Sequence, residues 1–392
     1  MSHLPQFRHV TPAYRTFCGE KALDALPGEL DRLRCSRAVV VGGSWLVDRP
    51  DALSAIESAL GRRMAGRFDD VEEHSPIPAV EKARRMLDET RADAVIAVGG
   101  GSSIVTARAA SILLAEGRDV RELCTRRGAD GRLISPKLVA PKIPNWVVPS
   151  TPITAYAKAG SAVRDPGTGE RLALFDPKTR AQGVFLDPRV ALTAPAGLTS
   201  AAALNAFSMA VECLEAGVDD PLADALLIHA LRMLAEWLPR LQGQPDDPEV
   251  RLRLMLAALL CGQGSDYVGG GLAQALSHAA GPRSSVSNGV VEALLLPHTM
   301  RFNVPVTGPR LGLVADALDP APNAEGAPHE RAVAAVERTL AALAVPRRLR
   351  DVGVAQEALD DIVEAALDDW SITRVPRTVR RDDVVQLLKS AW

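Results

Sequence analysis

The 392-residue chain is poor in aromatic residues and in cysteine. Phe, Trp and Tyr together make up 4% of it, and the five cysteines are scattered without a CxxC pair. Such an odd, separated set is typical of reduced thiols rather than of a disulfide framework, and it excludes a zinc knuckle. We therefore expect a cytoplasmic protein.

The sequence also lacks a surplus of positive charge and a long hydrophobic run. Forty-five Lys and Arg face 48 Asp and Glu, which gives a formal charge of −3. Nucleic acids and anionic membranes are bound through basic surfaces. No uninterrupted apolar run reaches about 18 residues, and the N-terminus has no hydrophobic segment of the signal-peptide type. We expect no nucleic-acid partner and no membrane partner.

What the chain does have is a first half in which β-type and helical patterns alternate. Its length exceeds the roughly 250 to 300 residues at which a single core splits, so two domains are expected. Alternating strands and helices predict βαβ units and a parallel sheet. A segment rich in turn residues at 164–188 is typical of a β-hairpin. The expected strands are 37–43, 93–101 and 145–152, and the expected helices are 49–63 and 78–92.

From residue 188 onward, the strand patterns give way to long helical periodicities. We therefore predict a Rossmann-like α/β domain over 1–187 and an all-helical domain over 188–392, with the active site in the cleft between them.

The clearest motif is "VIAVGGGSSIVTARAAS" at 95–111, an apolar strand followed by a glycine-rich turn and a helix. Glycines let backbone N–H groups approach a phosphate, and serine hydroxyls add donors at the positive end of the helix. The motif differs from GxGxxG, but its context predicts a phosphate site. The residues concerned are Gly99, Gly100, Gly101, Ser102 and Ser103.

Three stretches give the chain a family resemblance. They are "AVGGGSSIVTARA", "LDPRVALTAPAGLTSAAALNAFSMAVE" and "NGVVEALLLPHTMRFN". In order and spacing they resemble the iron-containing (group III) alcohol dehydrogenases, and "HSPIPAVEKARR" with Asn205 favours the maleylacetate reductase branch. The resemblance implies an NAD(P)-dependent reductase with a Rossmann-like N-terminal domain and an all-helical C-terminal domain, commonly a homodimer.

The resemblance also implies a cofactor site. It assigns the pyrophosphate to the glycine turn and the nicotinamide side to Ser150, Thr151 and Thr154. At the end of the second strand, where relatives often carry a ribose-binding carboxylate, this chain has Gly42 and Gly43. Without that carboxylate a 2′-phosphate is not repelled, so both NADH and NADPH remain open.

The metal ligands that the family implies are replaced. Metal-using members place Asp and His four residues apart on one helix and two further His residues on others. This chain has Asn205, Met209, Gln274 and Asn288 at those positions. Amide oxygens and a thioether are poor ligands for Fe²⁺ or Zn²⁺, which predicts a metal-free site. These four residues, with Tyr267 and Arg283, are our candidates for substrate binding.

The candidate catalytic residues are His278, Tyr156 and Lys158. His278 lies four residues after Gln274 and is suited to act as a general acid near neutral pH. These features predict a metal-independent NAD(P)H-dependent reduction of a carbonyl or conjugated double bond in a small carboxylated substrate. Two alternatives stay open: a non-redox lyase, cyclase or decarboxylase of secondary metabolism, and a non-catalytic binding subunit.

Overall fold

A computed structural model describes residues 7–128, 133–156, 158–216, 218–266, 268–320 and 325–392. The chain forms two compact units. Among the described residues, the α/β unit comprises those within 12–151 and 155–195, and the helical unit comprises those within 7–11, 152–154 and 196–392. The change to the helical unit thus falls at 195/196 rather than at the expected 187/188. The reason is α6 (Pro188–Ala191), which packs on α2 and β7 of the α/β unit.

The α/β unit is built on a six-stranded sheet in the order β1-β10-β7-β4-β2-β3, in which all neighbouring strands are parallel. Every residue of β2, β4, β7 and β10 is buried, as expected for parallel strands that are covered on both faces. The predicted parallel sheet is therefore confirmed. The strands are β1 (Arg15–Cys18), β2 (Ala38–Val41), β3 (Met64–Phe68), β4 (Ala94–Gly99), β7 (Asn145–Pro149) and β10 (Gly183–Leu186).

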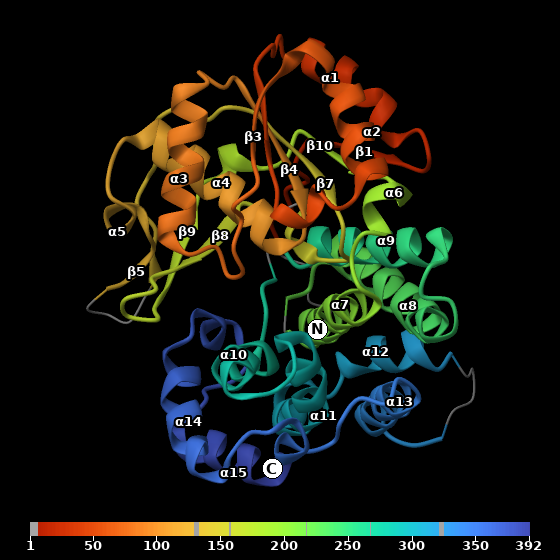
Figure 1. Cartoon of the computed structure of the whole chain (residues 1–392). Coiled ribbons are helices and arrows are strands. Elements are labelled where there is room, and N and C mark those ends of the chain that lie inside the picture. The colour runs from red at the N-terminus through yellow and green to blue at the C-terminus, as the bar shows by residue number, and fades with distance from the viewer. Residues whose placement is uncertain (1–6, 129–132, 157, 217, 267, 321–324) are drawn as a thin grey trace. The chain divides into compact units, whose positions relative to one another are not determined.

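Helices cover both faces of this sheet (Figure 1). One face carries α3 (Ile77–Glu89) and α4 (Gly101–Glu116), and the other carries α1 (Leu26–Arg32) and α2 (Pro50–Leu60) together with α6. A continuous hydrophobic core joins α1 and α2 to the central strands. The unit therefore has the three-layer architecture in which ligands bind at the carboxyl ends of the strands.

The hairpin predicted at 164–188 is placed differently. The hairpin consists of β8 (Gly160–Arg164) and β9 (Arg171–Phe175), which pair antiparallel. The segment "GVFL" of β10 belongs instead to the main sheet, between β1 and β7. All four of its residues are buried, which suits a central parallel strand and not a hairpin with one solvated face.

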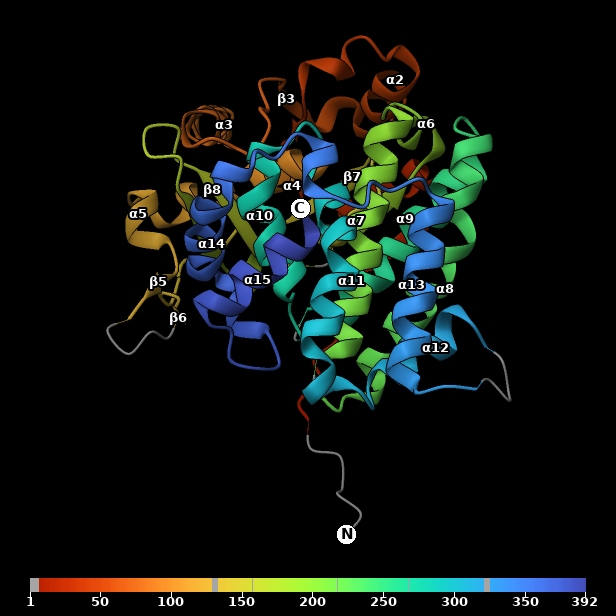
Figure 2. The ribbon, with the colours of Figure 1, turned by 90° about the horizontal axis from the view of Figure 1, so that it is seen from below.

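The helical unit is arranged around two central helices, α7 and α11. Figure 2 shows α8, α9, α12 and α13 on one side of this pair and α10, α14 and α15 on the other. The bounds are α7 (Ala196–Glu215), α8 (Pro221–Gly243), α9 (Pro248–Gly264), α10 (Leu272–Ala280), α11 (Asn288–Thr307), α12 (Leu311–Leu318), α13 (Pro328–Ala342), α14 (Leu359–Asp368) and α15 (Arg381–Ala391).

Small residues let α7 and α11 approach each other closely. A Cβ built on Gly289 lies 2.0 Å from the carbonyl oxygen of Ala201, so only glycine fits there. In the described part of the chain, α7 is the one helix long and apolar enough to cross a membrane, but 72% of its apolar window is buried. That burial is typical of the core helix of a folded domain.

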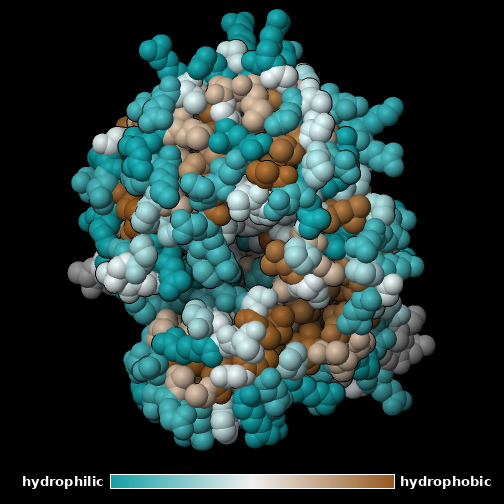
Figure 3. Space-filling view, in the orientation of Figure 1, coloured by the Kyte–Doolittle hydropathy of each residue, from teal (hydrophilic) through white to brown (hydrophobic). Residues whose placement is uncertain are grey.

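The face drawn in Figure 3 carries both hydrophilic and hydrophobic residues. Large hydrophobic side chains that are exposed in the helical unit include Leu198, Val218, Leu222 and Val306. Such residues are normal on a protein surface, so we assign them no role.

Candidate active site

The glycine turn connects β4 to the first turn of α4. Gly99, the last residue of β4, has a φ of +130°, and a Cβ built there lies 2.6 Å from Oγ of Ser103. Gly100 is the extended N-cap residue, and α4 begins at Gly101. The turn thus requires glycine for its backbone angle and for its close contact. It leaves the first N–H groups of a 16-residue helix at the carboxyl edge of the sheet, where they suit an anionic group.

A neighbouring loop holds the start of α4. The backbone N–H of His74 donates to Oγ of Ser102 at 3.2 Å, and Oγ of Ser75 donates to the Ser102 carbonyl at 3.0 Å. His74 and Ser75 have φ values of +64° and +50°, a region that residues other than glycine rarely adopt. Strain of this kind clusters at ligand sites, which agrees with a site at the start of α4.

The end of β7 lies beside the glycine turn. The backbone N–H of Ser150 donates to the Gly99 carbonyl at 3.0 Å, and a Cβ built on Gly100 lies 3.3 Å from Oγ1 of Thr151. The structure therefore brings Ser150 and Thr151 next to the predicted phosphate site. Thr154 is buried and groups with the helical unit.

The two glycines after β2 pack against a residue that the sequence did not single out. The N–H of Gly42 donates to the Phe68 carbonyl at 2.9 Å. A Cβ built on Gly43 lies 2.6 Å from Cδ1 of Trp45, and one built on Gly99 lies 3.2 Å from Cζ2 of the same ring. The indole of Trp45 therefore spans the ends of β2 and β4. Its signal in the sequence was an aromatic residue two positions after a Gly-Gly pair, in a chain with few aromatics.

The structure does not support a catalytic role for Tyr156. Its ring is fully buried, and its hydroxyl donates to the Thr151 carbonyl. A phenol held in this way stabilises the strand end and is not presented to a ligand. Lys158 is half-buried, and within the part of the chain that the structure describes its ammonium group has no ion pair.

A buried arginine holds the segment that contains Tyr156. The guanidinium of Arg108, on α4, donates to the carbonyls of Ala155, Tyr156 and Gly160. Arg108 is completely inaccessible to solvent. This bonding gives a structural reason for the basic residue in the "ARA" part of the motif, because it ties the chain after β7 to the helix after the glycine turn.

In the helical unit, Asn205 on α7 contacts a buried carboxylate on α11. Nδ2 of Asn205 donates to Oε2 of Glu292 at 2.5 Å, and Glu292 is 0% exposed. The sequence analysis missed Glu292, which lies one helical turn after Asn288 inside an apolar run. An acidic residue within such a run was the available signal. The contact fixes the amide of Asn205 with its nitrogen towards Glu292.

The other substituted ligand positions have their own neighbours. Oε1 of Gln274 accepts a hydrogen bond from Oγ of Ser371 at 3.1 Å, and Met209 is buried. Oδ1 of Asn288 lies against the backbone of Gly281, 1.8 Å from a Cβ built there. Among the described residues, no group of three or more His, Cys, Asp or Glu side chains is arranged to hold a metal ion. The donor set at these positions does not fit iron or zinc.

His278 is paired with a carboxylate. Its Nδ1 lies 2.8 Å from Oδ2 of Asp369, and Oδ1 of the same carboxylate accepts a hydrogen bond from the N–H of Ser371 at 2.8 Å. Burial alone would raise the pKa of the Asp369 carboxyl, but the hydrogen bond and charge of His278, with bonds from Ser371, hold it below its usual value. Since Ser371 also bonds Gln274, one network orients both candidate side chains of α10.

The two remaining candidates for substrate binding are less informative. Arg283 is exposed, and its Nη1 donates to the Ala279 carbonyl at the end of α10 at 2.8 Å. Tyr267 lies outside the described residues.

Two further carboxylates are buried where α7 meets α10 and α11. Glu212 accepts a hydrogen bond from the N–H of Ala273, in the first turn of α10, at 2.6 Å. Burial raises the pKa of Glu212 to about 7. Burial also raises the pKa of Glu215 to about 8, although Thr307 donates a hydrogen bond to it at 3.2 Å. Neither glutamate was anticipated from the sequence.

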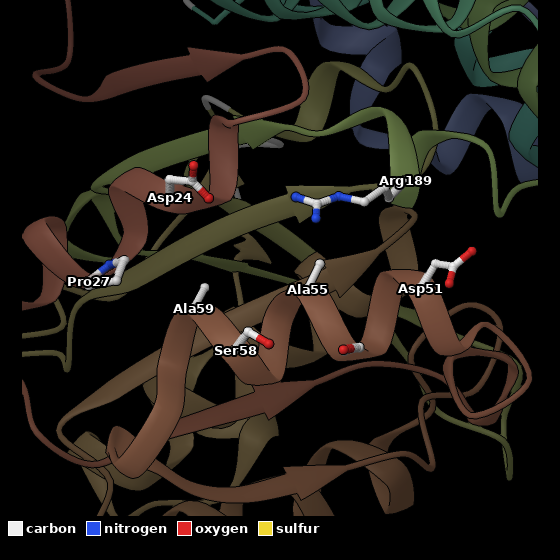
Figure 4. Close-up of a pocket in the computed structure, with 8 residues that line it drawn as sticks. Asp24, Pro27, Asp51, Ala55, Ser58, Ala59 and Arg189 are labelled. Carbon is white, nitrogen blue, oxygen red and sulfur yellow. The ribbon is translucent and has the colours of Figure 1, made fainter.

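A pocket of about 630 Å³ lies elsewhere in the α/β unit, among α1, α2 and α6 (Figure 4). It has Asp24, Asp51 and Arg189 at its edges, and serines of α2 line it. The guanidinium of Arg189 pairs with the buried carboxylate of Asp187 at 2.7 Å. The pocket lies on the sheet face opposite α4, and it contains none of the residues predicted from the sequence. We therefore do not assign the active site to it.

The three-layer parallel sheet, the glycine turn before α4 and the separate helical unit define a dinucleotide-binding type of α/β protein joined to a helical domain. Family profiles agree with this class. Residues 13–188 match "Iron-containing alcohol dehydrogenase", and residues 199–392 match "Fe-containing alcohol dehydrogenase family, C-terminal". The chain belongs to the iron-containing alcohol dehydrogenase family, which is a family of oxidoreductases.

Individual relatives cover most of the chain. Lactaldehyde reductase of Escherichia coli (strain K12) is 30% identical over 95% of this chain and 97% of its own. NAD-dependent methanol dehydrogenase of Bacillus methanolicus is 27% identical over 81% and 82%. The crystal structure of maleylacetate reductase from Rhizobium sp. strain MTP-10005 has a TM-score of 0.80 at 25% identity and covers 99% of both chains. The predicted fold and the likeness to the maleylacetate reductase branch are confirmed.

Proposed function

We propose that this protein is a metal-independent NAD(P)H-dependent reductase of a carbonyl or conjugated double bond in a small carboxylated substrate. The observation that supports NAD(P)H binding is the glycine turn at the start of α4, with Thr151 beside it. The turn offers N–H groups to a pyrophosphate, and Thr151, after the end of β7, offers a hydroxyl to the part of the cofactor next to the pyrophosphate.

Metal independence rests on the chemistry of the substituted positions. Asn205 is engaged with Glu292 and Gln274 with Ser371, while Met209 offers only a thioether. A transition metal needs several imidazole, carboxylate or thiolate donors at one point. Neutral amides stabilise a developing oxyanion less than a metal does, which favours a substrate whose acceptor is already electron-poor.

The proton in this reduction is assigned to His278. A bound dihydronicotinamide supplies the hydride from its C4 atom. Reduction also needs a proton at the atom that becomes negatively charged. The contact between Nδ1 of His278 and Asp369 sets the orientation of the imidazole ring, as a catalytic imidazole requires. Asn205 retains an amide N–H and an oxygen for hydrogen bonds to the substrate.

Calorimetric titration with NADH and NADPH tests the proposal directly. We expect at least one of them to bind with a dissociation constant between about 1 μM and 1 mM, the usual range for enzyme substrates. We further expect NADH-dependent reduction of an activated oxo-acid such as maleylacetate to persist after dialysis against EDTA. Failure of both nucleotides to bind at about 1 mM would remove the reductase assignment and leave the non-redox or binding roles. A loss of activity in EDTA that zinc or iron restores would remove metal independence.

The second test concerns the His278–Asp369 pair. We expect His278→Gln to lower kcat by about 10²- to 10⁴-fold, the usual contribution of a general acid, with nucleotide affinity unchanged. Asp369→Asn should lower kcat less and shift its pH profile, because it leaves the imidazole without its carboxylate. The matched control is His229→Gln, at an exposed position on α8. Equal kcat values for His278→Gln and the control would show that the proton comes from another group.

A further inference from the structure

We propose that Trp45 forms the adenosine-binding wall of the nucleotide site, with its indole stacked on the adenine in place of a ribose-binding carboxylate. The inference rests on the proposed binding of NAD(P)H and names a residue that recognises the cofactor. Four observations support it: the contacts of the ring, its place on the sheet, its exposure and the chemistry of the strand end.

The contacts show that the indole and a side chain at position 43 exclude each other. A Cβ on Gly43 lies 2.6 Å from Cδ1 and 2.7 Å from Nε1 of Trp45. Real Cβ atoms do not approach other atoms so closely, so a carboxylate at this position would displace the ring. The position of the Trp45 ring therefore requires glycine at residue 43. At this strand end the chain presents an aromatic surface where a carboxylate would otherwise stand.

The place of Trp45 on the sheet selects the adenosine half of the cofactor. In the strand order, β4 lies between β7 and β2, and the glycine turn follows β4. A dinucleotide whose pyrophosphate lies at this turn extends across the carboxyl ends of the strands, with one nucleoside on each side. Thr151 marks the β7 side, which the family resemblance gives to the nicotinamide. Trp45, at the end of β2, is then on the adenosine side.

The exposure and surroundings of the ring suit stacking. Trp45 is only half-buried, and its ring spans Gly43 and Gly99, neither of which has a side chain to cover it. Stacking on an aromatic side chain uses only the π-face of the base, so it does not require a charged partner for the ribose. The acidic residues of the neighbouring strand end are Asp69, which pairs with Arg67, and Asp70, whose backbone bridges to Gly43.

Fragments of the cofactor separate the two ends of the site. We expect Trp45→Ala to weaken the binding of AMP and of ADP-ribose by about 5- to 150-fold, as loss of one stacked base predicts. Trp45→Phe should retain most of the affinity, and nicotinamide mononucleotide should bind all variants equally. The matched control is Trp237→Ala, because Trp237 is also half-buried but lies on α8 of the helical unit. Circular dichroism melting would establish that each variant is folded.

Unchanged or tighter binding of ADP-ribose to Trp45→Ala would overturn the inference, since the indole would then only fill or block the site. That result differs from failure of the proposed function, in which the unaltered protein would bind neither ADP-ribose nor the dinucleotides. A second experiment replaces the aromatic ring by a carboxylate at the same strand end. Gly43→Asp combined with Trp45→Ala should shift the ratio of NADH to NADPH affinity at least about tenfold towards NADH, because a carboxylate repels a 2′-phosphate. An unchanged ratio would show that position 43 does not face the ribose and would also count against the inference.

Discussion

Replacing Arg108 with methionine is expected to destabilise the α/β unit by about 1 to 3 kcal/mol. The guanidinium donates to the buried carbonyl of Tyr156 and to the partly buried carbonyls of Ala155 and Gly160, and a buried carbonyl left without a donor costs about 1 to 3 kcal/mol. Chemical denaturation followed by circular dichroism measures the change. We also expect weaker binding of ADP-ribose, because Arg108 connects the helix after the glycine turn to the chain after β7.

The controls for Arg108 separate its bonding from its charge. Arg108→Lys keeps the charge but has a single nitrogen with a different geometry, so an intermediate loss is expected. Arg85→Met, at an exposed position on α3, should change the free energy of unfolding by no more than about 0.5 kcal/mol. If Arg108→Met were as stable as the Arg85 control, the three carbonyls would not depend on the guanidinium.

Replacing Glu215 with glutamine is expected to stabilise the protein at pH 8 by a few kcal/mol. Burial raises the pKa of Glu215 to about 8, whereas a glutamate in the unfolded chain has a pKa near 4.5. Between these values the folded state binds more protons than the unfolded state, so the contribution of Glu215 to stability is fully present below about pH 4.5 and is lost as the pH rises towards 8. Glutamine cannot ionise and retains an oxygen for the Thr307 hydroxyl, so the variant should lose most of this dependence.

Chemical unfolding at pH 5, 6.5 and 8 measures how steeply the free energy of unfolding changes with pH. Glu212, whose pKa burial raises to about 7, contributes in the same direction, so the Glu215→Gln protein should retain part of the fall. The control is Glu236→Gln, at an exposed position on α8 that pairs with Arg240. The free energy of unfolding of this control should equal that of the unaltered protein at every pH. A Glu215→Gln protein with the full slope would show that Glu215 is ionised in the folded state.

Local patterns predicted the parts of the fold that have a local cause. The strands β2, β4 and β7 are apolar runs bounded by turn residues, and the glycine turn has its own signature, so all were found. The edge strands β1 and β3 were missed. "MAGRF" in β3 mixes glycine and arginine with apolar residues and has only one buried residue, so no pattern distinguishes it. β3 becomes a strand through its parallel pairing with β2, a tertiary contact that the local sequence does not show.

The candidate site shows the same limit. The sequence located the glycine turn, because the turn depends on a short spacing, while the assignment of Asn205, Met209, Gln274 and Asn288 to ligand positions stays a prediction. It missed Glu292 and Asp369, whose partners Asn205 and His278 lie 87 and 91 residues away along the chain. It also assigned chemistry to Tyr156, because the burial of a phenol depends on tertiary packing that no neighbouring residue reports. Trp45 was overlooked because its ring packs against Gly43 and Gly99, and the contact with Gly99 arises only when β2 and β4 pair in the sheet.

The close crossing of α7 and α11 at Gly289 links the Asn205–Glu292 contact to the packing of the helical core. A methyl group at residue 289 would meet the carbonyl of Ala201 and push the two helices apart. Asn205 and Glu292 lie within one turn of that crossing, so the same displacement would pull their side chains away from each other. The contact between Asn205 and Glu292 therefore depends on the absence of a side chain at residue 289, and a larger residue there is expected to separate the two side chains even though it touches neither.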